Sequence, residues 1–111
     1  MKEKYKAAFI IPVDALKTLG ENGWEFETSK RISIALSTYL IGELNLRCLE
    51  KHSDFDSYIS DSVKMTIIYD DDKLIESIYF QLIGDSLPKL KALLRDSRLE
   101  NFELFIPSEI N

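Results

Sequence analysis

The sequence VKMTIIYDDDKLIESIYFQL at residues 63–82 contains the clearest structural pattern in the chain. On both sides of a polar centre, apolar residues alternate with polar ones. The alternating apolar residues are Val63, Met65, Ile67, Ile78, Phe80 and Leu82. Alternation with a period of two is typical of half-buried strands. The central residues Asp70–Lys73 are of the kind that turns favour. The segment therefore predicts a β-hairpin with strands at 63–69 and 74–83.

The residues after this hairpin predict a helix and a final strand. Gly84-Asp85-Ser86 can begin a helix with Pro88 in its first turn, and the helix can continue to about Ser97. One face of that helix is apolar: Leu87, Leu90, Leu93 and Leu94. The run FELFI at 102–106 predicts a strand that Pro107 ends.

The residues before residue 28 predict one strand, one short helical turn and a pair of core aromatics. A strand is expected over 4–13, ended by Pro12. Asp14 is then expected to cap a single helical turn that stops at Gly20. After a turn at 21–23, Trp24 and Phe26 would lie on the same side of an extended segment, and Trp24 is expected to be anchored in or beside the core.

The segment 28–51 is compatible with two structures. As a helix capped by Thr28 or Ser29, it would have one apolar stripe: Ile32, Ala35, Leu36, Tyr39 and Leu40. As a strand, its alternation is also good, but it would need an unusually apolar turn at 40–44, so we favour the helix. The helix gives a β-α-β-β-α-β order, a ferredoxin-like split βαβ with helices on one face of an antiparallel sheet. The alternative is a larger antiparallel sheet with one main helix, and both are α+β.

Size and composition predict a single domain over residues 1–111. The chain has 45% hydrophobic residues, which is enough for its own core without disulfides or metals. It has one cysteine, no basic and apolar leader, and only short apolar runs, so we expect a cytoplasmic protein without a membrane span. Its net charge of −5 disfavours nucleic acids and anionic membranes and favours a basic protein partner.

The acidic charge is concentrated in residues 53–72. This segment has six acids and one base, which gives 1 − 6 = −5, so the other residues cancel. Its acidic and aromatic side chains are the candidate partner-binding residues: Asp54, Phe55, Asp56, Tyr58, Asp61, Asp70, Asp71 and Asp72. Carboxylates would attract a basic partner and the rings would provide buried contact area. The alternative is a solvated loop with both rings turned into the core.

A strand at 63–69 would be about 23 Å long at ~3.3 Å per residue, so it is expected to hold the two acidic clusters apart. We favour 54–61 as the binding surface because it has the rings, and interpret Asp70–Asp72 as a hairpin tip.

The chain lacks a pattern typical of catalysis, cofactors or metals. Cys48 and His52 are four residues apart and could pair on one helix face, but a buried structural cysteine beside a surface histidine is the better interpretation. No paired zinc ligands, calcium loop or phosphate-binding glycine loop occurs in the sequence. We therefore expect a protein that is not an enzyme and has no cofactor.

The size, the acidic charge and the aromatic–acidic segment DFDSY at 54–58 resemble the small immunity proteins of bacterial toxin systems, above all those of contact-dependent growth inhibition. The resemblance implies a tight 1:1 complex in which the chain covers the basic active site of a nuclease toxin. Two alternatives are a small acidic dimeric secretion chaperone and a ferredoxin-like regulatory or ligand-binding module.

Overall fold

The computed structural model describes residues 5–97 and 101–109, and within them it has the predicted α+β class. Lys4, the first residue of the predicted N-terminal strand, lies outside these ranges. The strands are β1 (Lys6–Pro12), β2 (Leu16–Gly20), β3 (Gly23–Glu27), β4 (Arg47–Lys51), β5 (Phe55–Ile59), β6 (Val63–Tyr69), β7 (Ile75–Leu82) and β8 (Phe102–Phe105). The helices are α1 (Ile34–Glu43), α2 (Ser86–Asp96) and the short 3-10 helix η1 (Pro107–Glu109).

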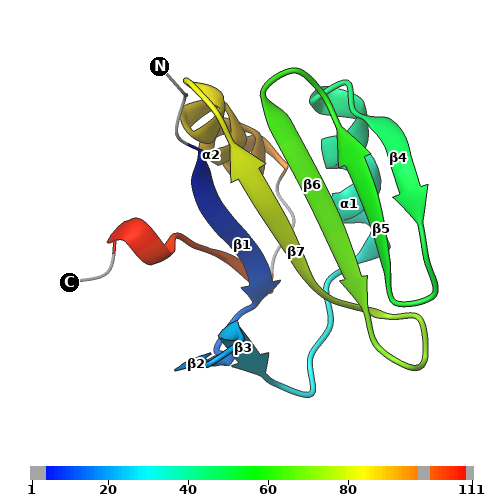
Figure 1. Cartoon of the computed structure of the whole chain (residues 1–111), viewed down its shortest axis with the longest axis vertical. Coiled ribbons are helices and arrows are strands. Elements are labelled where there is room, and N and C mark those ends of the chain that lie inside the picture. Colours follow the sequence, from blue (N-terminus) through cyan, green and yellow to red (C-terminus); the bar gives the residue numbers. More distant parts are fainter. Residues whose placement is uncertain (1–4, 98–100, 110–111) are drawn as a thin grey trace.

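Six of these strands form one antiparallel sheet in the order β4-β5-β6-β7-β1-β8 (Figure 1). β1 lies between β7 and β8 and is antiparallel to both. β7 and β8 therefore run parallel to each other on either side of β1 and are connected by α2, as in a split βαβ unit, while β4 and β5 add two strands that the predicted β-α-β-β-α-β order lacks. The sheet is larger than the favoured order predicts, as in the alternative, but two helices pack on it rather than one.

The C-terminal half confirms the sequence prediction. β6 and β7 form the predicted hairpin, and α2 and β8 follow it in the predicted order. Alternation determines which side chains are buried: Met65, Ile67, Ile78 and Phe80 are at most 2% exposed. Period-two burial in a strand and an apolar helix stripe are local patterns, so the sequence is sufficient to reveal them.

The predicted helical turn after Asp14 is wrong. Residues 16–20 are β2, which pairs along its whole length with β3 as a separate two-stranded sheet. Asp14 adopts a left-handed backbone conformation (φ 67°) and is not a helix cap. Five residues are too few for a stable helix, so strand pairing satisfies their backbone groups instead. Gly23, at φ 103°, provides the sharp turn between the two strands.

The segment 28–51 combines both expected structures, a helix and then a strand. α1 begins later than predicted, because the Ser33 hydroxyl accepts a hydrogen bond from the Ala35 backbone at 3.1 Å. The helix ends before Asn45 (φ 53°), and β4 follows. Ser37 is buried although it is polar, and its hydroxyl donates to the Ile34 carbonyl at 2.8 Å.

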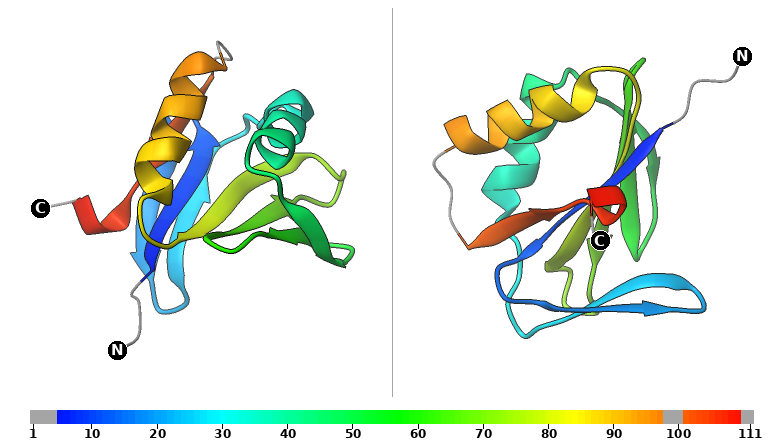
Figure 2. Two further views of the ribbon diagram at one scale, coloured as in Figure 1. Left: turned by 90° about the horizontal axis from the view of Figure 1, so that it is seen from above. Right: turned by 90° about the vertical axis from the view of Figure 1, so that its left-hand side faces the viewer.

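Both helices lie on one side of the sheet, and the β2–β3 hairpin extends toward the other side (Figure 2). The main core lies between the helices and the sheet, where Leu36, Leu40 and Leu90 contact the buried side chains of β1, β6 and β7. A second, smaller cluster lies on the opposite face, where the hairpin covers β1 and β8 through Ile11, Phe105 and neighbouring aromatics. The helices therefore cover one face of the sheet except at the exposed edge strand β4, and the other face is covered only at one end.

Candidate protein-binding face

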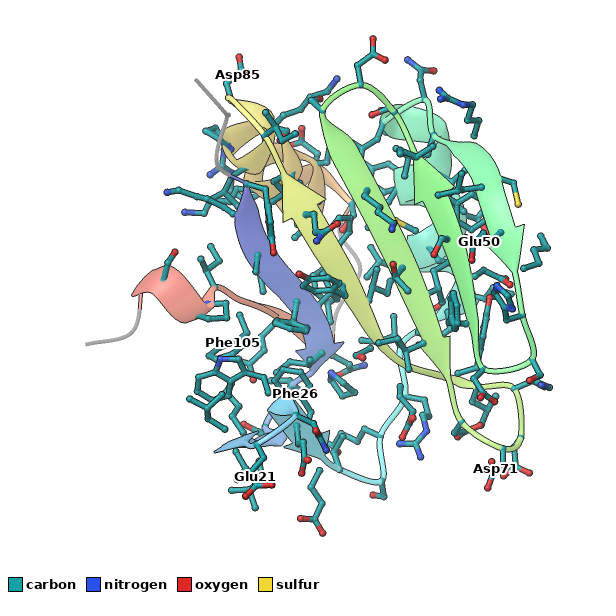
Figure 3. The ribbon with its side chains drawn as sticks, viewed as in Figure 1. Glu21, Phe26, Glu50, Asp71, Asp85 and Phe105 are labelled. Carbon is teal, nitrogen blue, oxygen red and sulfur yellow. The ribbon has the colours of Figure 1, made fainter. Side chains whose placement is uncertain are left out.

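The uncovered part of the second face is the candidate functional site, and we call it the open face. Its side chains alternate with the buried ones along the central strands: Phe55, Ser57, Ile59, Lys64, Thr66, Ile68, Ser77, Tyr79 and Gln81. Except for the buried Ser57 and Ser77, these side chains are half-buried. In Figure 3 the open face is toward the viewer and the helices lie behind it. Neither α1 nor α2 packs on it.

Aromatic contacts hold the β2–β3 hairpin at one end of the open face. The ring centroids of Trp24 and Phe26 lie 4.8 Å and 5.7 Å from that of Phe105, in edge-to-face geometry. Such pairs stabilise beyond the area that they bury. The Lys17 ammonium also lies 3.1 Å from a Glu103 carboxylate oxygen. The prediction that Trp24 anchors an extended segment is confirmed, and Figure 3 shows Phe26 beside Phe105.

Two recesses lie along the open face, and Ile68 lines both. The apolar recess, of about 400 Å³, has no charged residue in its lining, which consists of Ala7, Phe9, Asn22, Gly23, Trp24, Ile68, Tyr79 and Pro107. The acidic recess, of about 380 Å³, has two carboxylates and one ammonium in its lining, which consists of Glu50, Asp54, Phe55, Ser57, Lys64, Thr66 and Ile68. The open face therefore has an apolar end beneath the hairpin tip and a polar, acidic end beside β4.

The predicted aromatic–acidic segment does not form a single surface. It is not a loop, because Phe55–Ile59 is β5 and its side chains alternate between the two faces. Phe55 lies on the open face with its ring stacked on that of His52, at a centroid distance of 4.5 Å. Tyr58 lies opposite Met65 on the helix-bearing face and packs against the core. The expectation that both rings contribute to one contact surface is therefore wrong.

Asp56 also lies on the helix-bearing face and is used within the fold. It pairs with Ile67, and its carboxylate accepts a hydrogen bond from the Tyr69 hydroxyl at 2.8 Å. Burial, together with the hydrogen bond and charge of Asp56, raises the pKa of Tyr69 to about 12. Lys51, opposite Asp56 on β4, has its pKa raised by the nearby Tyr58 and Asp56. Asp56 is therefore a structural hydrogen-bond acceptor.

The two acidic clusters are not held apart as predicted. β5 runs antiparallel to β6, which brings the start of β5 to the end of β6. The Tyr69 backbone amide donates to the Asp54 carbonyl at 2.9 Å, and the Lys73 ammonium donates to the Ser53 carbonyl. Asp54 therefore lies at the same end of the sheet as Asp70–Asp72. Asp61 alone lies at the opposite end, in the β5–β6 turn beside a third recess of about 240 Å³.

Asp70 differs from its neighbours because it organises the β6–β7 turn. Its carboxylate accepts hydrogen bonds from the backbone amides of Asp72 (2.8 Å) and Leu74 (3.0 Å) and forms an ion pair with the Arg31 guanidinium at 2.7 Å. The hydrogen bond from Arg31, with those from the backbone amides, lowers the pKa of Asp70. Arg31 also donates to the Thr28 and Lys30 carbonyls, so this pair attaches the segment before α1 to the turn.

Three predicted residues remain accessible: Asp61, Asp71 and Asp72. All three are exposed, and within the described part of the chain their carboxylates form no ion pair. Asp54 is also exposed, and its carboxylate accepts only a long 3.4 Å hydrogen bond from the Ser53 hydroxyl. Asp71 lies at the outermost point of the β6–β7 turn in Figure 3. These four carboxylates are the predicted residues that a partner could reach.

Cys48 and His52 do not form a pair. Cys48 is on β4 opposite Tyr58, on the helix-bearing face, whereas His52 stacks on Phe55 on the open face. Cys48 is exposed, so the expectation of a buried cysteine is wrong. The His52 ring lies 2.8 Å from a Glu50 carboxylate oxygen. In residues 5–97 and 101–109, no group of three or more His, Cys, Asp or Glu side chains could hold a metal ion.

Of the nine residues that define the open face, sequence reasoning named only Phe55 and missed the other eight. The alternation of 64, 66 and 68 with buried residues of β6 was visible, and it placed their side chains on the second face of the sheet. Whether that face is covered depends on the position of the β2–β3 hairpin, for which the sequence carried no local signal.

Comparison with known proteins finds no family model, curated protein or solved structure that matches the chain. Neither α1 nor α2 is long and apolar enough to cross a membrane.

Proposed function

We propose that this chain is a non-catalytic binding protein of the immunity type, which binds a basic nuclease toxin in the cytoplasm and covers its active site in a 1:1 complex. The open face is the observation that carries the proposal, because about half of its side chains are apolar. Carboxylates that form no ion pair within the described residues border it at both ends: Asp54 and Asp71 at one end and Asp61 at the other. An uncovered apolar surface with a charged border is typical of a protein-interaction site.

The dimensions of the face support a protein partner. From β4 to β1 the sheet spans four strand spacings, about 19 Å at ~4.8 Å each, and β6 is about 23 Å long. This area is about half of the ~800 Å² that one partner contributes to a standard interface. The acidic turns at both ends are therefore needed to complete the contact, which agrees with a basic partner.

Copurification of the tagged chain from its native host tests the proposal. We expect recovery of a basic nuclease, a 1:1 mass by light scattering, and weaker binding at high salt because border charges are screened. The proposal fails if the chain captures no protein partner or if saturating amounts leave the captured enzyme active.

Charge reversal identifies the surface. Asp54→Lys with Asp71→Lys changes two free carboxylates of the open face, and we expect at least about tenfold weaker binding, equivalent to ~1.4 kcal/mol. Glu43→Lys with Asp96→Lys is the matched control, since it makes the same change in net charge at the ends of α1 and α2. Equal loss in both variants would indicate a general charge effect and would contradict the assignment. Asp56 is unsuitable for this test because it accepts the Tyr69 hydrogen bond.

A further inference from the structure

We infer that the open face recognises a partner segment in polyproline II conformation that carries one apolar side chain and, three residues away, one basic side chain. This inference rests on the proposed protein-binding function and specifies the chemistry of the segment. The apolar side chain would occupy the recess beneath the hairpin tip and the basic side chain the recess beside β4, with the segment crossing the strands above Ile68.

The composition of the two recesses assigns one side chain to each. The apolar recess contains the Phe9, Trp24 and Tyr79 rings and lacks a charged lining residue, so a charged group would lose its hydration there without compensation. The acidic recess contains the carboxylates of Glu50 and Asp54 and the ammonium of Lys64. The net charge of these three groups is negative, so the recess attracts a cation. A carboxylate oxygen of Glu50 also lies 2.8 Å from the His52 ring nitrogen Nε2.

The strand order determines the spacing. The apolar recess is centred on β7, because β1 and β6 provide residues on either side of it. The acidic recess is centred on β5, between β4 and β6. Two strand spacings separate the centres, which is about 10 Å at ~4.8 Å each. A polyproline II segment covers this length in three residues at ~3.1 Å per residue, and its residues three apart lie on the same side.

The hairpin makes the site directional. Trp24 and Gly23, at its tip, close the apolar recess on one side only, and the contacts with Phe105 hold them in place. At the opposite end, Asp71 and Asp72 add further carboxylates near Asp54, so attraction for a cation increases toward β4. A segment bound in the opposite orientation would place a cation against the rings and an apolar group among carboxylates.

Binding of capped hexapeptides to the ¹⁵N-labelled full chain, followed by NMR, tests this inference directly. The test peptide carries leucine and arginine three residues apart in a glycine–serine background. The controls carry the same residues adjacent to each other, or leucine and glutamate three residues apart. We expect the test peptide to shift the amide signals near Phe9 and near Asp54 together, and to bind about tenfold more tightly than either control, a ~1.4 kcal/mol difference.

Two substitutions test the recesses separately. Ala7→Trp fills the apolar recess and should remove binding of the test peptide, whereas Ala35→Trp adds the same ring on the exposed side of α1 and should not. Glu50→Gln with Asp54→Asn should weaken binding and reduce its salt dependence while the shifts near Phe9 persist. Shifts at one end only, equal binding of the adjacent-residue peptide, or no binding would each overturn the inference.

The outcomes separate this inference from the proposed function. If the peptides behave as expected but no toxin is captured, the two-recess site stands and the immunity function fails. If a toxin is captured but spacing has no effect on peptide binding, only the inference fails.

Discussion

The two faces of the six-stranded sheet differ in what covers them, although the same strands form both. On the helix-bearing face, α1 and α2 bury Met65, Ile78 and Phe80 completely. On the open face, their strand neighbours Lys64, Thr66 and Tyr79 remain half-buried. One face therefore stabilises the fold, and the other is available for a partner, as is common for antiparallel sheets with one solvated side.

The comparison also explains why the acidic segment cannot be treated as one surface. Adjacent residues of β5 point to opposite faces, so Asp56 and Tyr58 belong to the stabilising face and Phe55 to the open face. Asp70 also stabilises the fold, because its carboxylate binds the Arg31 guanidinium and two backbone amides. Substitutions should therefore affect either stability or binding according to the face, rather than according to position in the sequence.

The largest effect is expected from Phe80→Ala on the helix-bearing face. Phe80 is 0% exposed, so the substitution leaves a cavity and should lower the free energy of unfolding by about 4 kcal/mol. Urea denaturation measures this loss. The adjacent open-face substitution Gln81→Ala is the control and should change stability by no more than about 0.5 kcal/mol. Similar losses at both positions would contradict the difference between the faces.

Phe105→Ala should have the next largest effect, about 3 kcal/mol, because it removes the ring that holds Trp24 and Phe26. Trp24 is the only tryptophan, so release of the hairpin should shift the fluorescence emission of the folded protein to longer wavelength. Leu104→Ala, on the other face of β8, serves as the control: it should lower stability without this shift. An unchanged spectrum in folded Phe105→Ala would show that the hairpin is held by other contacts.

Tyr69→Phe should cost about 1 kcal/mol at neutral pH, because it removes the hydrogen bond to Asp56. The raised pKa of Tyr69 also predicts a pH dependence. Above the ordinary tyrosine pKa of 10, the unfolded chain ionises while folded Tyr69, with a pKa of about 12, stays neutral, so the wild-type protein should lose stability between these values. Denaturation at pH 9 and pH 11 should show a smaller loss in Tyr69→Phe than in the wild type.

Asp70→Asn should lower stability by less than Tyr69→Phe, since asparagine can still accept from the backbone amides. The pKa of Asp70 is lowered in the folded state, so its contribution is complete above the ordinary pKa of 3.8 and is lost as the pH falls through the lower folded value. Thermal unfolding from pH 7 to pH 2 should therefore show a smaller acid-dependent loss in Asp70→Asn than in the wild type. Asp71→Asn, at the same turn, should follow the wild type.

The smallest effect is expected from Cys48→Ala. Cys48 is exposed and lies away from His52, so stability should change by no more than about 0.5 kcal/mol and partner binding should be unchanged. Denaturation and copurification measure both. Cys48 and His52 lie on opposite faces, which argues against a catalytic pair. Loss of function in Cys48→Ala would support such a pair.

Local patterns allowed part of this structure to be predicted. The alternation around Met65 and Phe80 identified the β6–β7 hairpin, and the leucine stripe identified α2. β5 was missed because FDSYI has polar residues directed toward both faces, so it lacks the usual alternation of apolar and polar side chains. β2 was missed because a short segment at the edge of a molecule has little burial to shape its sequence.

Composition and local periodicity were sufficient for the α+β class, the main hairpin, the second helix and the concentration of negative charge in residues 53–72, because each depends on residues close in sequence. The antiparallel register of β5 against β6 is a long-range property, and it placed Asp54 beside Asp70–Asp72 and Phe55 on the open face. Long-range packing of the helices and of the β2–β3 hairpin likewise decided which face of the sheet stays open. The identity of the acidic residues was therefore readable from the chain, but which of them a partner can reach depended on the tertiary structure.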